Sequence, residues 1–327
     1  MQGTNTAIKP KYLLTLIVNL LIFYALWSWF DENVSLSVLL NAIKHIQLES
    51  LIVVAVLSVC VSLAYAFRLH ALINGSFWSA WLLVCVGNGL NNILPFRLGD
   101  AARVFIARER FQYDIQSLLA AMLIERYTDL AILLVLGFSF GLMAHWQTHA
   151  WFRLLLLVLL ACGSLSLLIY RAILTPGNRV REYLHRFDAC RLLLDKLVEM
   201  TELKRIGRSL SLASIVWVFT LLIYYVFFRL NLSVPFDLSA AIILCLSTTL
   251  AFAIPYMIAG IGVFESAIFY VLVQMLGVST GEAIAVALIF HLAFALPQLL
   301  LMLLAWLGLS WRRRTEKVLT VEEMLLR

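Results

Sequence analysis

The chain has 327 residues, of which 63% are apolar and 13% are charged, and its formal net charge is +6. Its mean hydropathy is +0.94. A soluble domain cannot cover so much apolar surface, so the composition excludes a soluble globular protein and indicates an integral membrane protein. The five cysteines show no CxxC spacing and suggest neither a disulfide framework nor a metal site. We expect no cofactor, no metal and no nucleic-acid partner.

Six apolar segments have lengths near the roughly 20 residues that cross the hydrocarbon core. In chain order they are residues 12–30, 51–67, 117–144, 152–170, 211–228 and 284–307. The end of the first has no small-residue cleavage pattern, so we predict a retained helix. Residues 81–95 and 238–276 do not behave as simple spans. The predicted fold is an all-α polytopic membrane protein, with about six full spans and two re-entrant or broken hairpins in an inverted-repeat arrangement.

Basic residues indicate the orientation of the chain. Lys9 and Lys11 precede the first span, residues 171–208 contain nine Arg and Lys, and Arg312–Arg314 follow the last span. The positive-inside rule places all three in the cytoplasm, so we expect a multi-pass protein of the inner membrane with both termini cytoplasmic. Apolar residues also recur at helical spacing over 179–208, which predicts an amphipathic helix that lies on the inner leaflet or packs on the protein.

This orientation predicts the path of the two irregular segments. The first hairpin, near 81–100, would enter from the cytoplasm and turn near Asn88, Asn91 and Asn92, because a full crossing would place the nine-charge loop outside. The second, near 238–276, would enter from the outside, although two full spans give the same end orientation. The single domain 1–327 then divides into a first half (1–170), a connector (175–208), a second half (209–311) and a tail (312–327).

Each irregular segment is interrupted by Pro and Gly and then presents an acid. The residues are Pro95, Gly99 and Asp100 in the first half, and Pro255, Gly260, Gly262 and Glu265 in the second. Paired broken segments in corresponding positions of two halves point to a transporter-type site near the bilayer midplane.

Ionisable residues inside apolar segments need partners or a function. Arg126 and Asp129 lie three apart on one predicted helix, beside Glu125, and can face each other as an ion pair that fixes helix register. Alternatively, Arg97, Arg103 and Arg126 offer guanidinium groups to a phosphate. Three further residues are candidates. Glu265 could neutralise one of those arginines or carry a proton, and His291 could be a packing residue or a proton relay. Asn92 could form hydrogen bonds with the hairpin backbone or contact the ligand.

Three motifs resemble those of the lysylphosphatidylglycerol synthase transmembrane family, also called the flippase-like domain family, over nearly the whole chain. The pattern Pro-x-Arg-x-Gly-acid-x-x-Arg is met by residues 95–103, and Glu-Arg-x-x-Asp by residues 125–129. The third, a Pro followed by glycines and a Glu, is met by residues 255–265. Asp100 stands where Glu is commoner, and Ala259 stands where the first glycine of a pair is usual.

The resemblance implies a lipid-handling membrane protein. Family members that make lysylphosphatidylglycerol carry a large soluble aminoacyl-transfer domain after the membrane part, and here about twenty residues follow the last span, so we expect no synthase activity. The expected function is the movement of an anionic lipid between leaflets. A polyprenyl-lipid-modifying enzyme, or a non-transporting accessory subunit that works with envelope biosynthesis enzymes, remains an alternative. The sequence contains none of the DxD, HExxH or P-loop motifs.

Overall fold

A computed structural model describes residues 28, 36–73, 75–142, 150–175, 177–252 and 262–325. Every regular element within these ranges is a helix, which confirms the predicted all-α membrane fold. The first predicted span lies outside the described residues except for Ser28. Pro255 and Gly260 also lie outside them.

Three helices are long and apolar enough to cross a membrane. They are α3 (Leu48–Ile73), α10 (Leu203–Asn231) and the Thr280–Ser310 part of α13 (Thr280–Leu325). They contain the predicted spans 51–67, 211–228 and 284–307. Two further long helices, α6 (Ile115–Leu142) and α7 (Ala150–Leu174), cover the described parts of the other two predicted spans.

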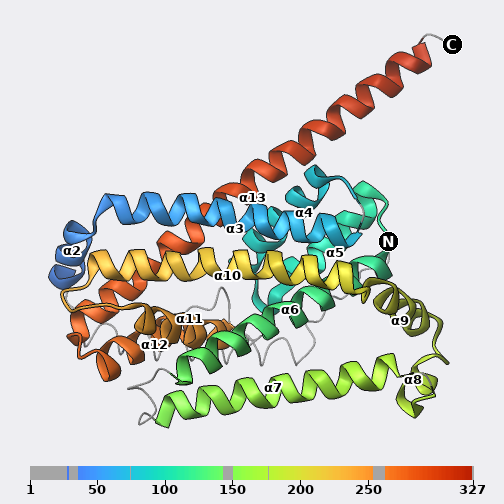
Figure 1. Cartoon of the computed structure of the whole chain (residues 1–327). Helices are drawn as coiled ribbons and strands as arrows, with labels where there is room; N and C mark the ends of the chain where they lie inside the picture. The colour runs from blue at the N-terminus through green and yellow to red at the C-terminus, as the bar shows by residue number, and fades with distance from the viewer. Residues whose placement is uncertain are drawn as a thin grey trace, which may run out of the picture.

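The helices α3 and α10 lie side by side along the length of the molecule, with the short α2 (Leu36–His45) at one end (Figure 1). Below them in this view, α10 packs on α11 (Leu238–Phe252) and α6. Buried aromatic rings fill the centre of this core: the Phe290 ring centroid lies 4.9 Å from that of Phe227 and 4.8 Å from that of Phe228. Dense packing of this kind holds helices together where lipid provides no hydrophobic driving force.

The first hairpin is formed by α4 (Phe77–Asn91), a 3-10 turn (Pro95–Arg97) and α5 (Leu98–Phe111). With 15 and 14 residues, each helix is only about 20 Å long, shorter than the roughly 30 Å hydrocarbon core. At the open end, Tyr113 Oη lies 2.5 Å from Ser79 Oγ. The chain therefore returns to the side from which it came, as the sequence predicted for this segment.

Glycine permits the close approach of the two helices at the tip of this hairpin. A Cβ atom on Gly99 would lie 2.1 Å from the carbonyl oxygen of Gly87 and 2.7 Å from the backbone nitrogen of Asn91. The motif glycine is thus required because the backbone of α4 occupies the place of a side chain.

The second hairpin consists of α11, α12 (Val263–Tyr270) and a π-helical turn (Val271–Met275). The Phe252 and Phe264 rings pack with centroids 5.0 Å apart. The 13 residues from Val263 to Met275 are too few for a full span, which favours the re-entrant interpretation. Figure 1 shows α4 and α5 toward one end of the bundle and α11 and α12 toward the other.

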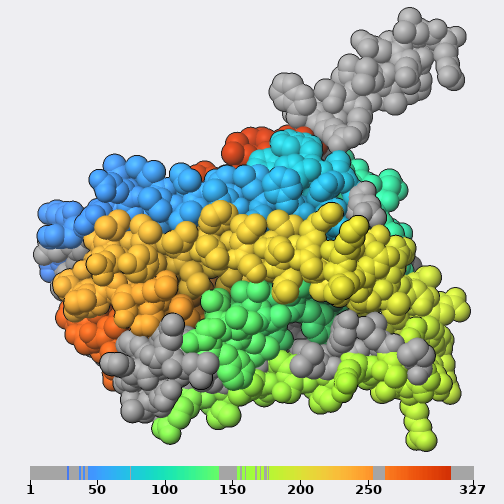
Figure 2. All heavy atoms as spheres, viewed as in Figure 1, coloured from blue at the N-terminus to red at the C-terminus, as the bar shows by residue number. Residues whose placement is uncertain are grey.

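The connector contains α8 (Arg179–Leu184) and α9 (Asp188–Met200), followed by the first turns of α10. Two short helices thus replace the single helix expected over 179–208, because the chain turns between Leu184 and Asp188. Leu194, Leu197 and Met200 of α9 are buried in a cluster with residues of α6. The apolar face of α9 therefore packs on the protein, at the end of the bundle that carries α5 and the start of α10 (Figure 2).

Candidate functional site

A buried ion pair joins α3 to α6. Arg68 Nη1 lies 2.6 Å from Asp129 Oδ1 and Nη2 lies 3.1 Å from Oδ2, so the guanidinium group binds the carboxylate through two parallel hydrogen bonds. Trp217 Nε1 donates to Asp129 Oδ1 over 3.2 Å. The Arg68 guanidinium also lies 4.9 Å from the centre of the Tyr65 ring. Arg68 is fully buried, so its charge is neutralised inside the protein.

A second buried pair joins α5 to α6 beside the first. Arg103 Nη2 lies 3.3 and 3.2 Å from the two carboxylate oxygens of Glu125. Glu125 Oε1 is also 3.9 Å from Arg68 Nε. The four side chains of Arg68, Asp129, Glu125 and Arg103 form one network, which we call the buried network.

A third group lies at the hairpin tip and is more accessible. Asp100 Oδ2 is 3.3 Å from Arg97 Nε and 3.5 Å from Arg126 Nη2, and Asn91 Nδ2 donates to Oδ1 over 3.0 Å. The side chains of Arg97 and Arg126 are 44% and 46% exposed. We call Arg97, Asp100 and Arg126 the open cluster, because its two guanidinium groups remain accessible.

The backbone of the tip is strained where the open cluster begins. Phe96 and Arg97 both have positive φ, 59° and 53°, in the left-handed region that non-glycine residues rarely adopt. Such a conformation costs about 1–3 kcal/mol per residue and is found mainly at functional sites. The turn that follows Pro95 therefore holds Arg97 in place at an energetic cost.

The structure corrects the predicted partner of Arg126. Arg126 and Asp129 do not pair, because Asp129 is buried toward α3 and binds Arg68, whereas Arg126 is half exposed and faces Asp100. Helical spacing predicts that the two side chains lie near each other. It does not show that each side chain pairs with a residue of a different neighbouring helix.

The structure also places Glu265 away from the arginines. Its Oε1 lies 2.5 Å from His291 Nδ1, and its Oε2 accepts a hydrogen bond of 2.6 Å from the backbone of Gly262. Glu265 therefore does not neutralise an arginine in the structure. The acid that lies beside Arg97 and Arg126 is Asp100. Glu265 and His291 form a pair of their own in the second half, between α12 and α13.

Asn92 is likewise outside the open cluster, because its Nδ2 donates to Gln298 Oε1 over 2.8 Å and ties the hairpin to α13. Arg68 is the residue that the sequence analysis missed. An arginine at the inner end of an apolar segment is usually an interfacial anchor whose charge reaches water. Its distance of 57 residues from Glu125 left no local signal of the pairing.

No group of three or more His, Cys, Asp or Glu side chains that could hold a metal ion occurs within the described ranges. The site consists of guanidinium and carboxylate groups. Four arginines (Arg68, Arg97, Arg103 and Arg126) meet three acids (Asp100, Glu125 and Asp129), which leaves one excess positive charge when all are ionised. A site of this kind favours an anion.

The chain matches none of the curated proteins with which it was compared. Residues 16–302 match the family model described as the lysylphosphatidylglycerol synthase TM region. The match includes all three motifs and both hairpins. The chain therefore belongs to the lysylphosphatidylglycerol synthase transmembrane-region family, whose name connects it with membrane lipids.

Proposed function

We propose that the protein moves an anionic, phosphate-bearing lipid between the leaflets of the cytoplasmic membrane. The observation that carries the proposal is the geometry around Asp100. Two half-exposed arginines share this single carboxylate at 3.3 and 3.5 Å, which is longer than the roughly 2.7–2.9 Å of a strong charge-assisted hydrogen bond. A phosphate group, with more acceptor oxygens, would bind both guanidinium groups in place of Asp100.

The buried network supports this role because it holds the helices around the open cluster in place. Arg68 and Arg103 are fixed by Asp129 and Glu125 and cannot leave to bind a ligand. They position α6 and α5, the helices that carry Arg126 and Asp100. A ligand would therefore exchange with Asp100 alone while the surrounding helices keep their places.

The depth of the open cluster also supports the proposal. Asp100 and Arg110 lie ten positions apart on α5, a rise of about 15 Å. With the Arg110 end at the headgroups and the helix along the membrane normal, Asp100 lies about half way through the roughly 30 Å hydrocarbon core. In the proposed mechanism the headgroup exchanges with Asp100 at this depth while the lipid tail stays in the bilayer, and the two hairpins open alternately.

The Glu265–His291 pair is our candidate for coupling. Both side chains are largely buried, and Glu265 also binds the backbone at the start of α12. A change in protonation of this pair would alter the contact between α12 and α13 and so favour one hairpin arrangement. In this proposal the termini face the cytoplasm, and envelope biosynthesis enzymes supply or consume the lipid.

The test measures headgroup accessibility in proteoliposomes that contain labelled phosphatidylglycerol, phosphatidylcholine or a polyprenyl phosphate. Wild type is compared with Arg97→Ala/Arg126→Ala. Each guanidinium–phosphate contact contributes roughly 1.5–3 kcal/mol, so the double variant should move the anionic lipid at least about tenfold more slowly. The matched control is Arg191→Ala/Arg205→Ala, which also removes two arginines, one exposed and one partly buried, that pair with acids three residues away.

Equal rates in wild type and in a folded Arg97→Ala/Arg126→Ala variant would contradict the assignment of the site. Failure of wild type to move any of the three lipids would contradict the transport function itself. In that case a lipid-modifying enzyme or an accessory subunit becomes the better proposal.

A further inference from the structure

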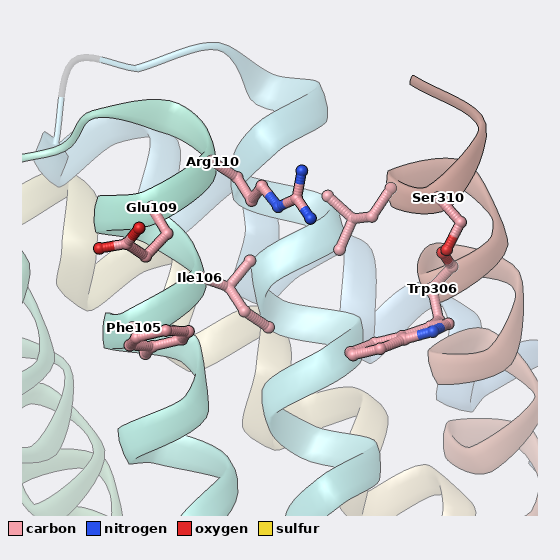
Figure 3. Close-up of a pocket in the computed structure, with 7 residues that line it drawn as sticks. Phe105, Ile106, Glu109, Arg110, Trp306 and Ser310 are labelled. Carbon is pink, nitrogen blue, oxygen red and sulfur yellow. The ribbon is translucent and has the colours of Figure 1, made fainter. Parts of the chain in front are cut away.

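A second, separate feature lies between α5 and α13 (Figure 3). It is a pocket of about 430 Å³, lined by Phe105, Ile106, Glu109, Arg110, Trp306, Leu309 and Ser310. None of these residues belongs to the buried network or the open cluster. The pocket is open to the outside of the helix bundle, because the Phe105 and Trp306 side chains are 66% and 55% exposed.

The pocket has a polar end and an apolar end. Figure 3 shows the Arg110 guanidinium pointing from α5 toward α13, at about the level of Ser310, whereas Phe105 and the Trp306 ring lie further along both helices. The Glu109 carboxylate is at the α5 edge and turns away from α13. Arg110 makes no hydrogen bond or ion pair with any side chain that the structure describes. The Arg110 guanidinium therefore lies at one end of the pocket, and the Phe105 and Trp306 rings lie at the other.

The position along the membrane normal fits a lipid headgroup. Arg110 is the penultimate residue of α5, at the end where the hairpin returns. On the facing helix, the basic run Arg312–Arg314 begins six residues, or about 9 Å, after Trp306. Tryptophan and arginine together are typical of the boundary between hydrocarbon and headgroups. The polar end then lies at the phosphates and the apolar end at the upper acyl chains.

We propose that this pocket binds one anionic phospholipid of the cytoplasmic leaflet, with its phosphate at Arg110 and its acyl chains along Phe105 and Trp306. The assignment of the leaflet rests on the proposed orientation of the chain. Under the proposed function, this is the position from which a lipid is loaded toward Asp100, which lies on the same helix. Binding itself does not depend on transport.

The experiment is native mass spectrometry of the full-length protein with added phosphatidylglycerol or phosphatidylcholine of equal chain length. Wild type should retain one phosphatidylglycerol more tightly than phosphatidylcholine. Arg110→Gln should weaken the binding of phosphatidylglycerol about tenfold, since one charge-assisted hydrogen bond is lost. Arg108→Gln is the matched control, because Arg108 lies two residues away on α5, is exposed and does not line the pocket.

Two further variants separate this site from the open cluster. Arg97→Ala/Arg126→Ala should keep the phosphatidylglycerol bound at the pocket even if transport stops or never occurs. Trp306→Ala should weaken the binding of both lipids, because it removes contact with the acyl chains rather than with the phosphate.

Equal losses in Arg110→Gln and Arg108→Gln would overturn the proposal, because they would show attraction to general surface charge. No loss in Arg110→Gln would overturn it as well. Glycerophosphoglycerol, the soluble headgroup without acyl chains, should not bind measurably; retention as strong as that of the lipid would indicate a site for a free phosphate ester instead.

Discussion

Arg68 is fully buried and has two acidic neighbours, so its charge makes the stability of the protein sensitive to single substitutions. Removing one partner of a buried ion pair typically costs about 3–5 kcal/mol, because the other charge is left uncompensated. We predict that Arg68→Met and Asp129→Leu each destabilise the protein by about this amount, measured by thermal or denaturant unfolding in detergent. Arg191→Ala, which breaks an exposed pair on α9, should change stability by less than about 1 kcal/mol.

The double variant Arg68→Met/Asp129→Leu provides the decisive comparison. It removes both charges together, and apolar residues of similar size can replace a buried pair at little cost. It should therefore be more stable than either single variant. If the stability losses of the two single variants added up in the double variant, Arg68 and Asp129 would not neutralise each other. Each residue would then act through other contacts, such as those with Glu125 or Trp217.

These residues also show what sequence spacing can and cannot predict. The polar identity of Glu125, Arg126 and Asp129 inside an apolar helix identified them as site residues. Their partners come from α3 and α5 and depend on how those helices pack, which spacing within one helix does not encode. Arg68 was therefore not predicted as a site residue, and Asp129 was predicted to pair with Arg126.

Among the helical elements, the first hairpin restricts its sequence most strongly at Gly99, where no side chain fits. Any Cβ there would meet the backbone of Gly87 and Asn91, and backbone cannot move aside as a flexible side chain does. We predict that Gly99→Ala separates α4 from α5, lowers the unfolding temperature and slows lipid movement, since Asp100 follows directly and Arg103 lies four positions later on the same helix. Thermal unfolding and the proteoliposome assay measure the two effects.

Gly207 offers a matched control on α10, because nothing lies within 4 Å of a Cβ built there. Alanine is favoured over glycine inside a helix by about 0.8–1 kcal/mol, so Gly207→Ala should leave the protein as stable as wild type or slightly more so. If Gly99→Ala were as well tolerated as Gly207→Ala, the close approach at the tip would have no role in holding the hairpin.

For the whole molecule, apolar length predicted the helices α3 and α10 and the membrane part of α13, and the positive-inside rule predicted that residues 81–95 do not cross. The loop charges could not decide between a hairpin and two spans over 238–276. The structure adds that the helical segment from Val263 to Met275 has only 13 residues, which is too few for a full span. Contacts between the halves, such as Asn92 with Gln298, join residues 206 positions apart and have no local signal.

The proposed topology can be tested by labelling of single cysteines from either side of the membrane, in a variant with the five native cysteines replaced by alanine. Gln112→Cys lies between α5 and α6, Arg191→Cys lies on α9, and Ser233→Cys lies between α10 and α11. If the first hairpin is re-entrant, a membrane-impermeant maleimide should label positions 112 and 191 from the cytoplasmic side only. Position 233 should be labelled from the outside only, because α10 crosses between it and α9. Labelling of positions 112 and 233 from the same side would contradict the arrangement in which the two hairpins enter from opposite faces, and with it the alternating mechanism proposed for the open cluster.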